Sequence, residues 1–258
     1  MVEKNDRRTP GSKERLAEIS HHFLSEPAVV VDTRHRPSFM PVLLDDVADV
    51  WVAHCIARAL TTRKRPSTVV YVEREMQQAA LDTLANIDRR GLVVPLTRRG
   101  DWNDHNAAQL RLLKSMGTQN SQHKFCLIPI SNLQTPVLDI FDRLLMPVAP
   151  GLAALRSAYL RIKRLSSNAN PMIGVTIIAC DNQEDARLYF DKLAVAALRF
   201  LRQRLIYCGY IPRHFAQGAG VEPVVRIAEG IPSELRDVTD HILTNKLYVS
   251  LTTSDTQP

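Results

Sequence analysis

Basic side chains follow the first strongly apolar segment of this chain of 258 residues. Residues 27–32, Pro-Ala-Val-Val-Val-Asp, predict a strand, and Arg34, His35 and Arg36 come directly after it. Guanidinium groups match the geometry of phosphate oxygens, so Arg34 and Arg36 could bind a phosphate through their side chains. A basic loop in contact with solvent is the alternative interpretation, and we favour it.

The backbone of the same segment lacks the features of a phosphate-binding loop. Such loops use glycine so that successive amides converge on the phosphates, and a lysine adds positive charge. Residues 33–41 contain no glycine and two prolines, each of which removes an amide donor. No glycine occurs from residue 12 to residue 90, and the dipeptide Gly-Lys occurs nowhere in the chain. We therefore expect the amide cradle to be missing.

Three carboxylates lie toward the start of the next predicted helix. The apolar spacing places this helix within residues 42–60, and Asp45, Asp46 and Asp49 lie near its beginning. Carboxylates at a helix N-terminus interact favourably with the helix dipole. The same negative charges oppose an incoming triphosphate, so this segment argues against a bound nucleotide.

Other polar clusters in the sequence give weak indications of a metal site. His21 and His22 are adjacent, and adjacent side chains diverge on a helix. Asp101, Asp104 and His105 lie together, but no further ligand follows at a recognisable spacing. We interpret the first pair as solvated or partly buried histidines and the second group as a helix cap with polar neighbours. No metal is expected.

The four cysteines are widely separated and lie in apolar surroundings, without a CxxC pair. This pattern predicts buried free thiols in a reducing compartment. The cysteines are Cys55, Cys126, Cys180 and Cys208.

The elements that must position these residues alternate between strand and helix patterns. Strands are predicted at 27–32, 68–72, 92–96, 124–130, 144–149, 171–180 and around 209–212, and helices at 42–60, 79–90, 152–165, 184–204 and 234–247. This order predicts a doubly wound α/β domain with a mainly parallel sheet and helices on both faces. We expect a disordered tail at 1–15, one domain at 16–232, and a C-terminal helix and tail at 233–258.

The segment 144–165 shows the alternation most clearly. Two apolar residues and Met-Pro-Val-Ala predict a strand, Pro150-Gly151 breaks it, and a helix follows. The predicted buried face of that helix consists of Leu152, Leu155, Tyr159 and Ile162. The predicted solvent face carries Arg156, Arg161, Lys163 and Arg164.

This segment and a second one resemble a known family. The first match is Pro150 followed by a helix with Ala154, Leu155, Ala158, Tyr159, Ile162, Lys163 and Leu165. The second is Phe200-Leu201 followed by Leu205-x-Tyr207-x-Gly209-Tyr210-Ile211-Pro212. Together they resemble the MinD/ParA branch of the P-loop ATPases, and most of all its flagellar-number regulators, FlhG or FleN. The resemblance covers roughly residues 140–215; the N-terminal half is similar only in outline.

The resemblance also implies where a nucleotide site would lie. In the family, the strand at 68–72 ends in an acidic residue used around Mg²⁺ and the attacking water, and Glu73 takes that place here. A second family carboxylate has no counterpart, because residues 106–138 contain no Asp or Glu. We therefore expect a degenerate, catalytically silent relative without a cofactor. The alternative is a working ATPase that binds ATP and Mg²⁺ through Arg34, Arg36 and Glu73.

The resemblance implies a regulatory scaffold that binds other proteins, in the control of flagellar number or placement and of motility. Family partners are a flagellar GTPase, a transcription regulator, assembly proteins or the membrane. A regulator of polysaccharide secretion or of partitioning is an alternative role. Relatives can carry a membrane-binding C-terminal amphipathic helix, but the helix at 234–247 has few basic residues, so we expect it to pack on the domain.

Composition limits the remaining possibilities. The net charge is +6 and the pI is about 9.3, which permits an acidic partner, and a basic nucleic-acid-binding regulator is a further alternative. The positive charge is dispersed and only 6% of residues are aromatic, so we expect no nucleic-acid partner. No apolar run reaches the roughly 20 residues of a membrane span. We expect a cytoplasmic protein, with peripheral contact with the inner membrane as the alternative.

Overall fold

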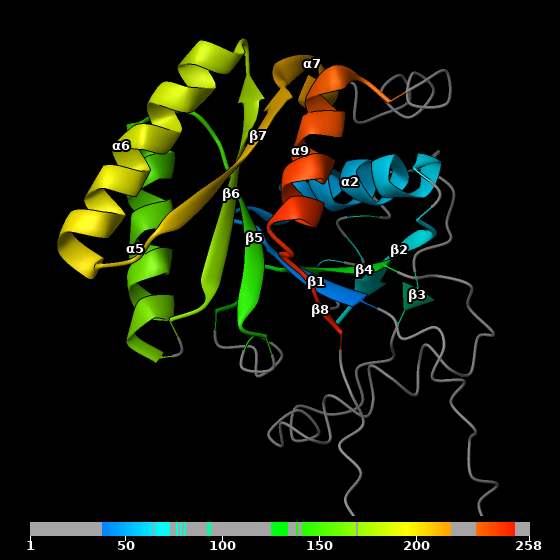
Figure 1. Cartoon of the computed structure of the whole chain (residues 1–258), viewed down its shortest axis with the longest axis horizontal. Coiled ribbons are helices and arrows are strands. Elements are labelled where there is room, and N and C mark those ends of the chain that lie inside the picture. The colour runs from blue at the N-terminus through cyan, green and yellow to red at the C-terminus, as the bar shows by residue number, and fades with distance from the viewer. Residues whose placement is uncertain are drawn as a thin grey trace, which may run out of the picture. The chain divides into compact units, whose positions relative to one another are not determined.

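The computed structural model contains one large sheet with helices packed on both faces (Figure 1). It describes residues 38–72 apart from 64, the single positions 76, 78, 80 and 138, and residues 92–93, 125–133, 141–168, 170–217 and 231–250. All of these belong to one compact unit, 35–258. The predicted strand at 27–32, the tail at 1–15 and the segment at 100–116 lie outside the described residues.

The sheet has eight strands in the order β3-β2-β4-β1-β5-β6-β7, with β8 paired to β1. All described pairings are parallel except that of β1 with β8. The strands are β1 (Ser38–Leu43), β2 (Ser67–Tyr71), β3 (Leu92–Val93), β4 (Phe125–Ile130), β5 (Arg143–Val148), β6 (Met172–Cys180), β7 (Leu205–Pro212) and β8 (Val249–Ser250). The central strands are almost continuously apolar because helices cover both of their faces. The predicted doubly wound, mainly parallel fold is confirmed.

The position of β1 corrects one prediction. We expected residues 33–41 to be a loop, yet Ser38–Leu43 is a central strand, paired with β4 over its whole length. All six residues are buried. Pro41 suggested a loop because it has no amide donor, but the burial of its neighbours outweighs one missing hydrogen bond. The connection that leaves this strand is therefore at 44–46.

The helices form two layers. After β1 come a 3-10 helix, η2 (Val47–Val50), and α2 (Trp51–Thr62). The others are α5 (Leu152–Asn168), α6 (Gln183–Leu201), the short α7 (Arg213–Gln217) and α9 (Ser233–Thr244). Helices α5 and α6 share one hydrophobic core with the sheet, whereas α2 and α9 share the other (Figure 1).

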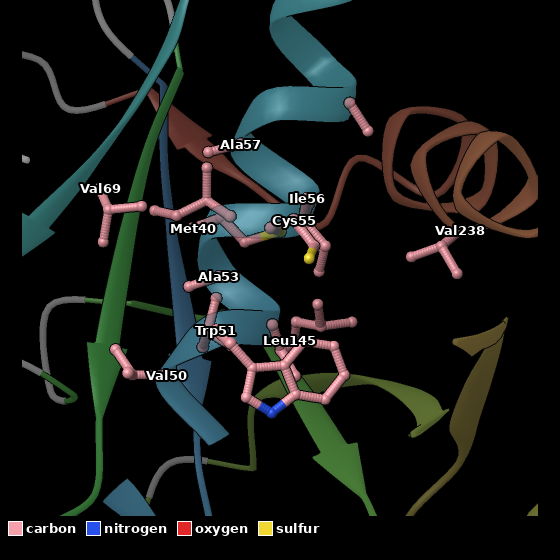
Figure 2. Close-up of a cluster of buried hydrophobic side chains, with 14 of the residues drawn as sticks. Met40, Val50, Trp51, Ala53, Cys55, Ile56, Ala57, Val69, Leu145 and Val238 are labelled. Carbon is pink, nitrogen blue, oxygen red and sulfur yellow. The ribbon is translucent and has the colours of Figure 1, made fainter. Parts of the chain in front are cut away.

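The C-terminal helix α9 is part of the second core. Figure 2 shows Trp51 and Ile56 of α2 beside Leu145 of β5, with Val238 of α9 pointing toward them. Leu247, after α9, is fully buried and occupies the space beside Gly174, where an added Cβ would come within 2.2 Å of its Cδ1. The apolar face of α9 therefore packs on the domain, as the sequence predicts.

Helices α5 and α6 differ in part from their predicted faces. Leu155 and Ile162 are buried as expected, but Leu152 is 81% exposed because it lies in the first turn, beyond the sheet. In α6, the apolar spacing of Phe190, Ala197 and Phe200 predicts that all three face inward, but Phe200 is 66% exposed. The helix ends one residue later, and Arg202 caps it in a left-handed conformation, so Phe200 extends past the core.

The chemistry of the core is that of a reduced protein. All four cysteines are buried and free, as predicted. Burial raises the pKa of the Cys55, Cys126 and Cys208 thiols to about 12. Within the described ranges, no helix has the length and apolar character that a bilayer crossing demands.

A buried histidine gives the domain a pH-dependent stability. His54 of α2 hydrogen-bonds the Tyr71 hydroxyl of β2, and burial lowers its pKa to about 4. As pH falls below 6.5 the unfolded chain binds a proton that the folded state excludes, so stability is lost between pH 6.5 and pH 4. We expect His54 to account for about 2–3 kcal/mol of that loss.

Urea unfolding at pH 7.5 and pH 4.5 measures this contribution. The variant His54→Gln should lose less stability than the wild type between the two pH values, whatever its stability at pH 7.5. An identical loss in both proteins would contradict the role of His54.

Candidate functional site

The candidate site lies at the carboxyl ends of β1 and β5. The segment after β1 leads to α2 on one face of the sheet, whereas the turn after β5 leads to α5 on the other face. Neighbouring strands whose connections diverge in this way leave a crevice, and open α/β sheets bind their ligands there. The turn after β5 contains Gly151 at φ +114°, a conformation that favours glycine.

Arg161 of α5 crosses this crevice to the end of β1. Its Nε lies 3.0 Å from Oδ1 of Asp45, and its Nη1 donates to the carbonyl of Leu44. Its Nη2 donates to the carbonyls of Asp45, at 3.3 Å, and Ser131, at 3.4 Å. Ser157 of α5 also donates to Oδ1 of Asp45, at 2.7 Å. One guanidinium therefore connects α5 to the ends of β1 and β4.

The prediction for α5 placed Arg161 on the solvent face, and this was wrong. Its side chain is only 17% exposed. Ala154, Ala158 and Arg161 share one side of the helix at spacings of four and three residues, and the two alanines leave room for the guanidinium to reach the strands. That spacing was the signal in the sequence that could have identified Arg161.

Several amides around β1 and η2 are already bonded within the protein. The amide of Leu44 donates to the carbonyl of Ile130 at 2.8 Å. Asp46 is the N-cap of η2: its Oδ1 accepts from the amide of Ala48 at 2.9 Å, and its carbonyl accepts from the amide of Asp49 at 3.0 Å. The N-terminus that would otherwise attract an anion is thus satisfied by a carboxylate of its own.

The third carboxylate, Asp49, is held in an unfavourable environment. Burial, and after it the negative charge of Asp46, raises the pKa of Asp49 to about 6. A hydrogen bond from the side chain of Trp51 acts in the opposite direction. Near neutral pH the described residues that line the mouth of the site therefore carry carboxylate charge against one guanidinium, that of Arg161.

These groups line a cavity of about 220 Å³. That is smaller than the roughly 300–1,000 Å³ typical of pockets for small molecules and cofactors. One wall is apolar and comes from β5 and α5; the other is polar and comes from the segment after β1. The lining residues are Leu43, Asp45, Asp46, Asp49, Met146, Pro147, Val148, Ala149, Ala154, Ala158 and Arg161.

The residues singled out in the sequence are only partly brought together here. Arg34, Arg36 and Glu73 lie outside the described residues. Of the motif residues, Ala154 and Ala158 line the cavity, and Pro150 is in the turn beside it. The others lie in the core or at other surfaces; among them are Tyr159, Lys163, Phe200, Leu201, Gly209, Ile211 and Pro212.

Gly209 shows what a motif residue does in the core. It has φ +91° in β7, and a Cβ there would lie 3.2 Å from Cγ2 of Val238 in α9. Its carbonyl accepts from the Thr176 hydroxyl at 3.2 Å. The glycine thus allows β7 and α9 to pack closely.

The described part of the chain contains no cluster of three or more His, Cys, Asp or Glu side chains arranged to hold a metal ion. His21, His22, Asp101, Asp104 and His105 lie outside it. The three carboxylates after β1 have other partners: Arg161 pairs with Asp45, the amide of Ala48 donates to Asp46, and the side chain of Trp51 hydrogen-bonds Asp49.

Comparison with known proteins finds similarity in structure alone. No family model matches the sequence, and no curated protein matches it either. The fold is similar to that of the MinC:MinD cell division protein complex of Aquifex aeolicus, with TM-score 0.53 and 14% identity over 80% of this chain and 96% of that chain. The similarity to the MinD cell division protein of Aquifex aeolicus has a TM-score of 0.52 and 14% identity, over 81% of this chain and 97% of that chain. The similarity to the structure of pNOB8 ParA bound to nonspecific DNA has a TM-score of 0.51 and 11% identity, over 81% of this chain and 99% of that chain. The chain therefore has the α/β fold of the MinD/ParA-type P-loop NTPases.

The raised pKa of Asp49 has a measurable consequence for stability. The folded state holds a proton on this carboxyl up to about pH 6, whereas the unfolded chain releases it near pH 3.8, so stability falls as pH rises between those values. Asp49→Asn should therefore be more stable than the wild type at pH 7.5, on the order of 1 kcal/mol once solvent screening is allowed for. The advantage should shrink toward pH 4.5, as measured by urea unfolding. An advantage of the same size at both pH values would show that Asp49 does not titrate as described.

Proposed function

We propose that this protein is a MinD/ParA-like regulator that has lost nucleotide catalysis and acts as a scaffold for protein partners, in the control of flagellar number, flagellar placement and motility. The MinD/ParA fold supplies the framework. The observation that carries the proposal is the Arg161–Asp45 contact at the end of β1. In P-loop proteins the corresponding loop holds phosphate.

Three features of the site oppose a nucleotide. Asp45, Asp46 and Asp49 place negative charge where a triphosphate would have to lie, without glycine in the connection at 44–46. The amides of Leu44, Ala48 and Asp49 are bonded internally. The guanidinium that could neutralise a phosphate is bonded to backbone carbonyls and to Asp45. Each feature costs binding energy, and together they support a protein that works without ATP and Mg²⁺.

The flagellar part of the proposal rests on the two motif segments. The first runs from β5 through the turn at Pro150 into α5, and the second from the end of α6 through β7. Both segments lie in the half of the domain that contains α5, α6 and α9. This resemblance to FlhG or FleN supports a flagellar GTPase, a transcription regulator or flagellar assembly proteins as partners.

Thermal unfolding with Mg-ATP tests the loss of nucleotide binding. A ligand at 100 times its dissociation constant adds about 2.7 kcal/mol of stability, which for a domain of this size is a rise in Tm of roughly 5–10 °C. We expect no rise with Mg-ATP or Mg-ADP, with a functional P-loop ATPase as positive control.

A rise in Tm would favour the rival function, an ATPase with a non-standard phosphate site. The double variant Arg34→Ala/Arg36→Ala would then identify the phosphate contact: loss of the rise assigns it to these arginines, whereas loss in Arg161→Ala assigns it to the crevice. Either result would contradict the nucleotide-free scaffold.

Deletion of the gene in the organism of origin tests the flagellar role. We expect the number or position of flagella, counted by electron microscopy, to change, and wild-type protein supplied in trans to restore it. Asp49→Asn should restore it equally well, because it alters the crevice without removing a partner surface. Unaltered flagella in the deletion strain would exclude the flagellar role and favour a regulator of secretion or partitioning.

A further inference from the structure

Exposed apolar side chains are concentrated on one layer of the domain. Among the described residues, every large apolar side chain that is substantially exposed belongs to α5, to the first position of β6 or to α6, and α2 and α9 have none. Isolated exposed apolar residues are normal, but a distribution restricted to one layer is not. The residues are Leu152, Leu160, Met172, Leu188, Val195, Leu198 and Phe200.

Some of these exposed apolar residues lie beside a group of basic residues, at the edge of the sheet where the parallel strands begin. Both α5 and α6 run back from the carboxyl edge of the parallel sheet, so their C-terminal turns lie at the same end. Ser166 and Gln203, which hydrogen-bond each other, connect these two ends, and Gln203 also donates to the Pro171 carbonyl at 3.0 Å. We define the basal surface as the exposed residues around this junction: Lys163, Arg164, Met172, Leu198, Arg199, Phe200, Arg202 and Arg204.

The charge of the basal surface is positive. No Asp or Glu occurs within residues 143–180 or 192–212, which contain all of its members. Asp142, at the same edge, pairs with Arg143 at 3.3 Å. Asp191, the last carboxylate of α6, pairs with Arg187 at 3.2 Å. The five basic side chains of the surface therefore face solvent without a carboxylate among its members.

The apolar members project beside these charges. Met172, Leu198 and Phe200 are 40%, 53% and 66% exposed. The Arg199 guanidinium lies 5.4 Å from the centre of the Phe200 ring, so a cation and an aromatic face are presented together. The cavity at the end of β1 lies at the opposite, carboxyl edge of the sheet and shares no residue with this surface.

We propose that the basal surface docks the protein on an anionic lipid bilayer. Lipid phosphates would meet the arginines and Lys163, while Leu198, Phe200 and Met172 would enter the boundary between headgroups and acyl chains. A second copy of the chain is opposed by like charge. Nucleic acid would satisfy the arginines but would leave Leu198 and Met172 without a favourable environment. The inference goes beyond the proposed function, and α9, whose apolar face is buried, takes no part in it.

Sedimentation of the full-length protein with vesicles, without nucleotide, tests this inference. We expect binding to vesicles that contain about one third phosphatidylglycerol and none to pure phosphatidylcholine. One basic residue near an anionic surface usually contributes about a fivefold increase in membrane binding. We therefore expect Arg199→Ala to lower the partition coefficient about fivefold, and Arg199→Ala/Arg202→Ala about 25-fold. Leu198→Ser should also lower it, with the dependence on salt unchanged. These positions are exposed, so the Tm should stay at the wild-type value.

Arg236→Ala is the matched control. Arg236 is exposed on α9, in the other layer, and its loss changes the net charge by the same amount. If Arg236→Ala and Arg199→Ala weaken vesicle binding equally, only the net charge of the protein matters, and the proposal is overturned. Absence of binding to the anionic vesicles would overturn it as well. Binding to duplex DNA or polyglutamate that needs Arg199 but not Leu198 would assign the surface to a soluble polyanion and overturn it too. Each of these outcomes leaves the ATP measurement, and hence the proposed function, unaffected.

Discussion

The domain is organised around the burial of a single strand, β1. Its six residues are covered on both faces: Phe39 and Leu43 belong to the core beneath α5 and α6, whereas Met40 and Val42 belong to the core beneath α2. Its edges are bonded to β4 along the whole strand, to β5 at one register position and to β8 at the other end. Both helix layers are thus positioned by this strand, and so is the acidic connection that follows it.

The carboxyl end of β1 then sets the chemistry of the crevice. A strand that ends between two diverging connections would present amides to a ligand, but here the amides of Leu44 and Ala48 are bonded internally. Arg161 supplies from α5 the positive charge that the carboxylates require. Because three carboxylates and one guanidinium line the crevice, its charge near neutral pH is negative, which disfavours an anion. The positive surface, by contrast, is at the opposite edge of the sheet, where α5 and α6 end.

The sequence predicted the doubly wound fold because its strands and helices differ clearly in apolar period. The apolar run at 171–180 and the helix at 184–204 could be identified in this way, and β6 and α6 lie there. Strand β1 was missed because Pro41 is a strong local signal, whereas burial on both faces is a property of the tertiary structure. Arg161 was missed for a related reason: a charged residue on an amphipathic helix is assigned to solvent unless its partner across the sheet is known. The placement of Asp45, Asp46 and Asp49 near the start of the helix needed no such knowledge and was anticipated, whereas the role of Asp46 as the N-cap was not.

The contact between Arg161 and Asp45 also bears on how readily such a site could change during evolution. Replacing Asp45 alone would leave Arg161 bonded to the carbonyls of Leu44 and Ser131, still across the crevice. Replacing Arg161 alone would remove the one cationic side chain among the described residues that line the crevice. Neither replacement alone frees the crevice for an anion, and the connection at 44–46 would still contain no glycine. Mutually dependent substitutions of this kind make the chemistry of the crevice slow to change, even where selection would favour a change.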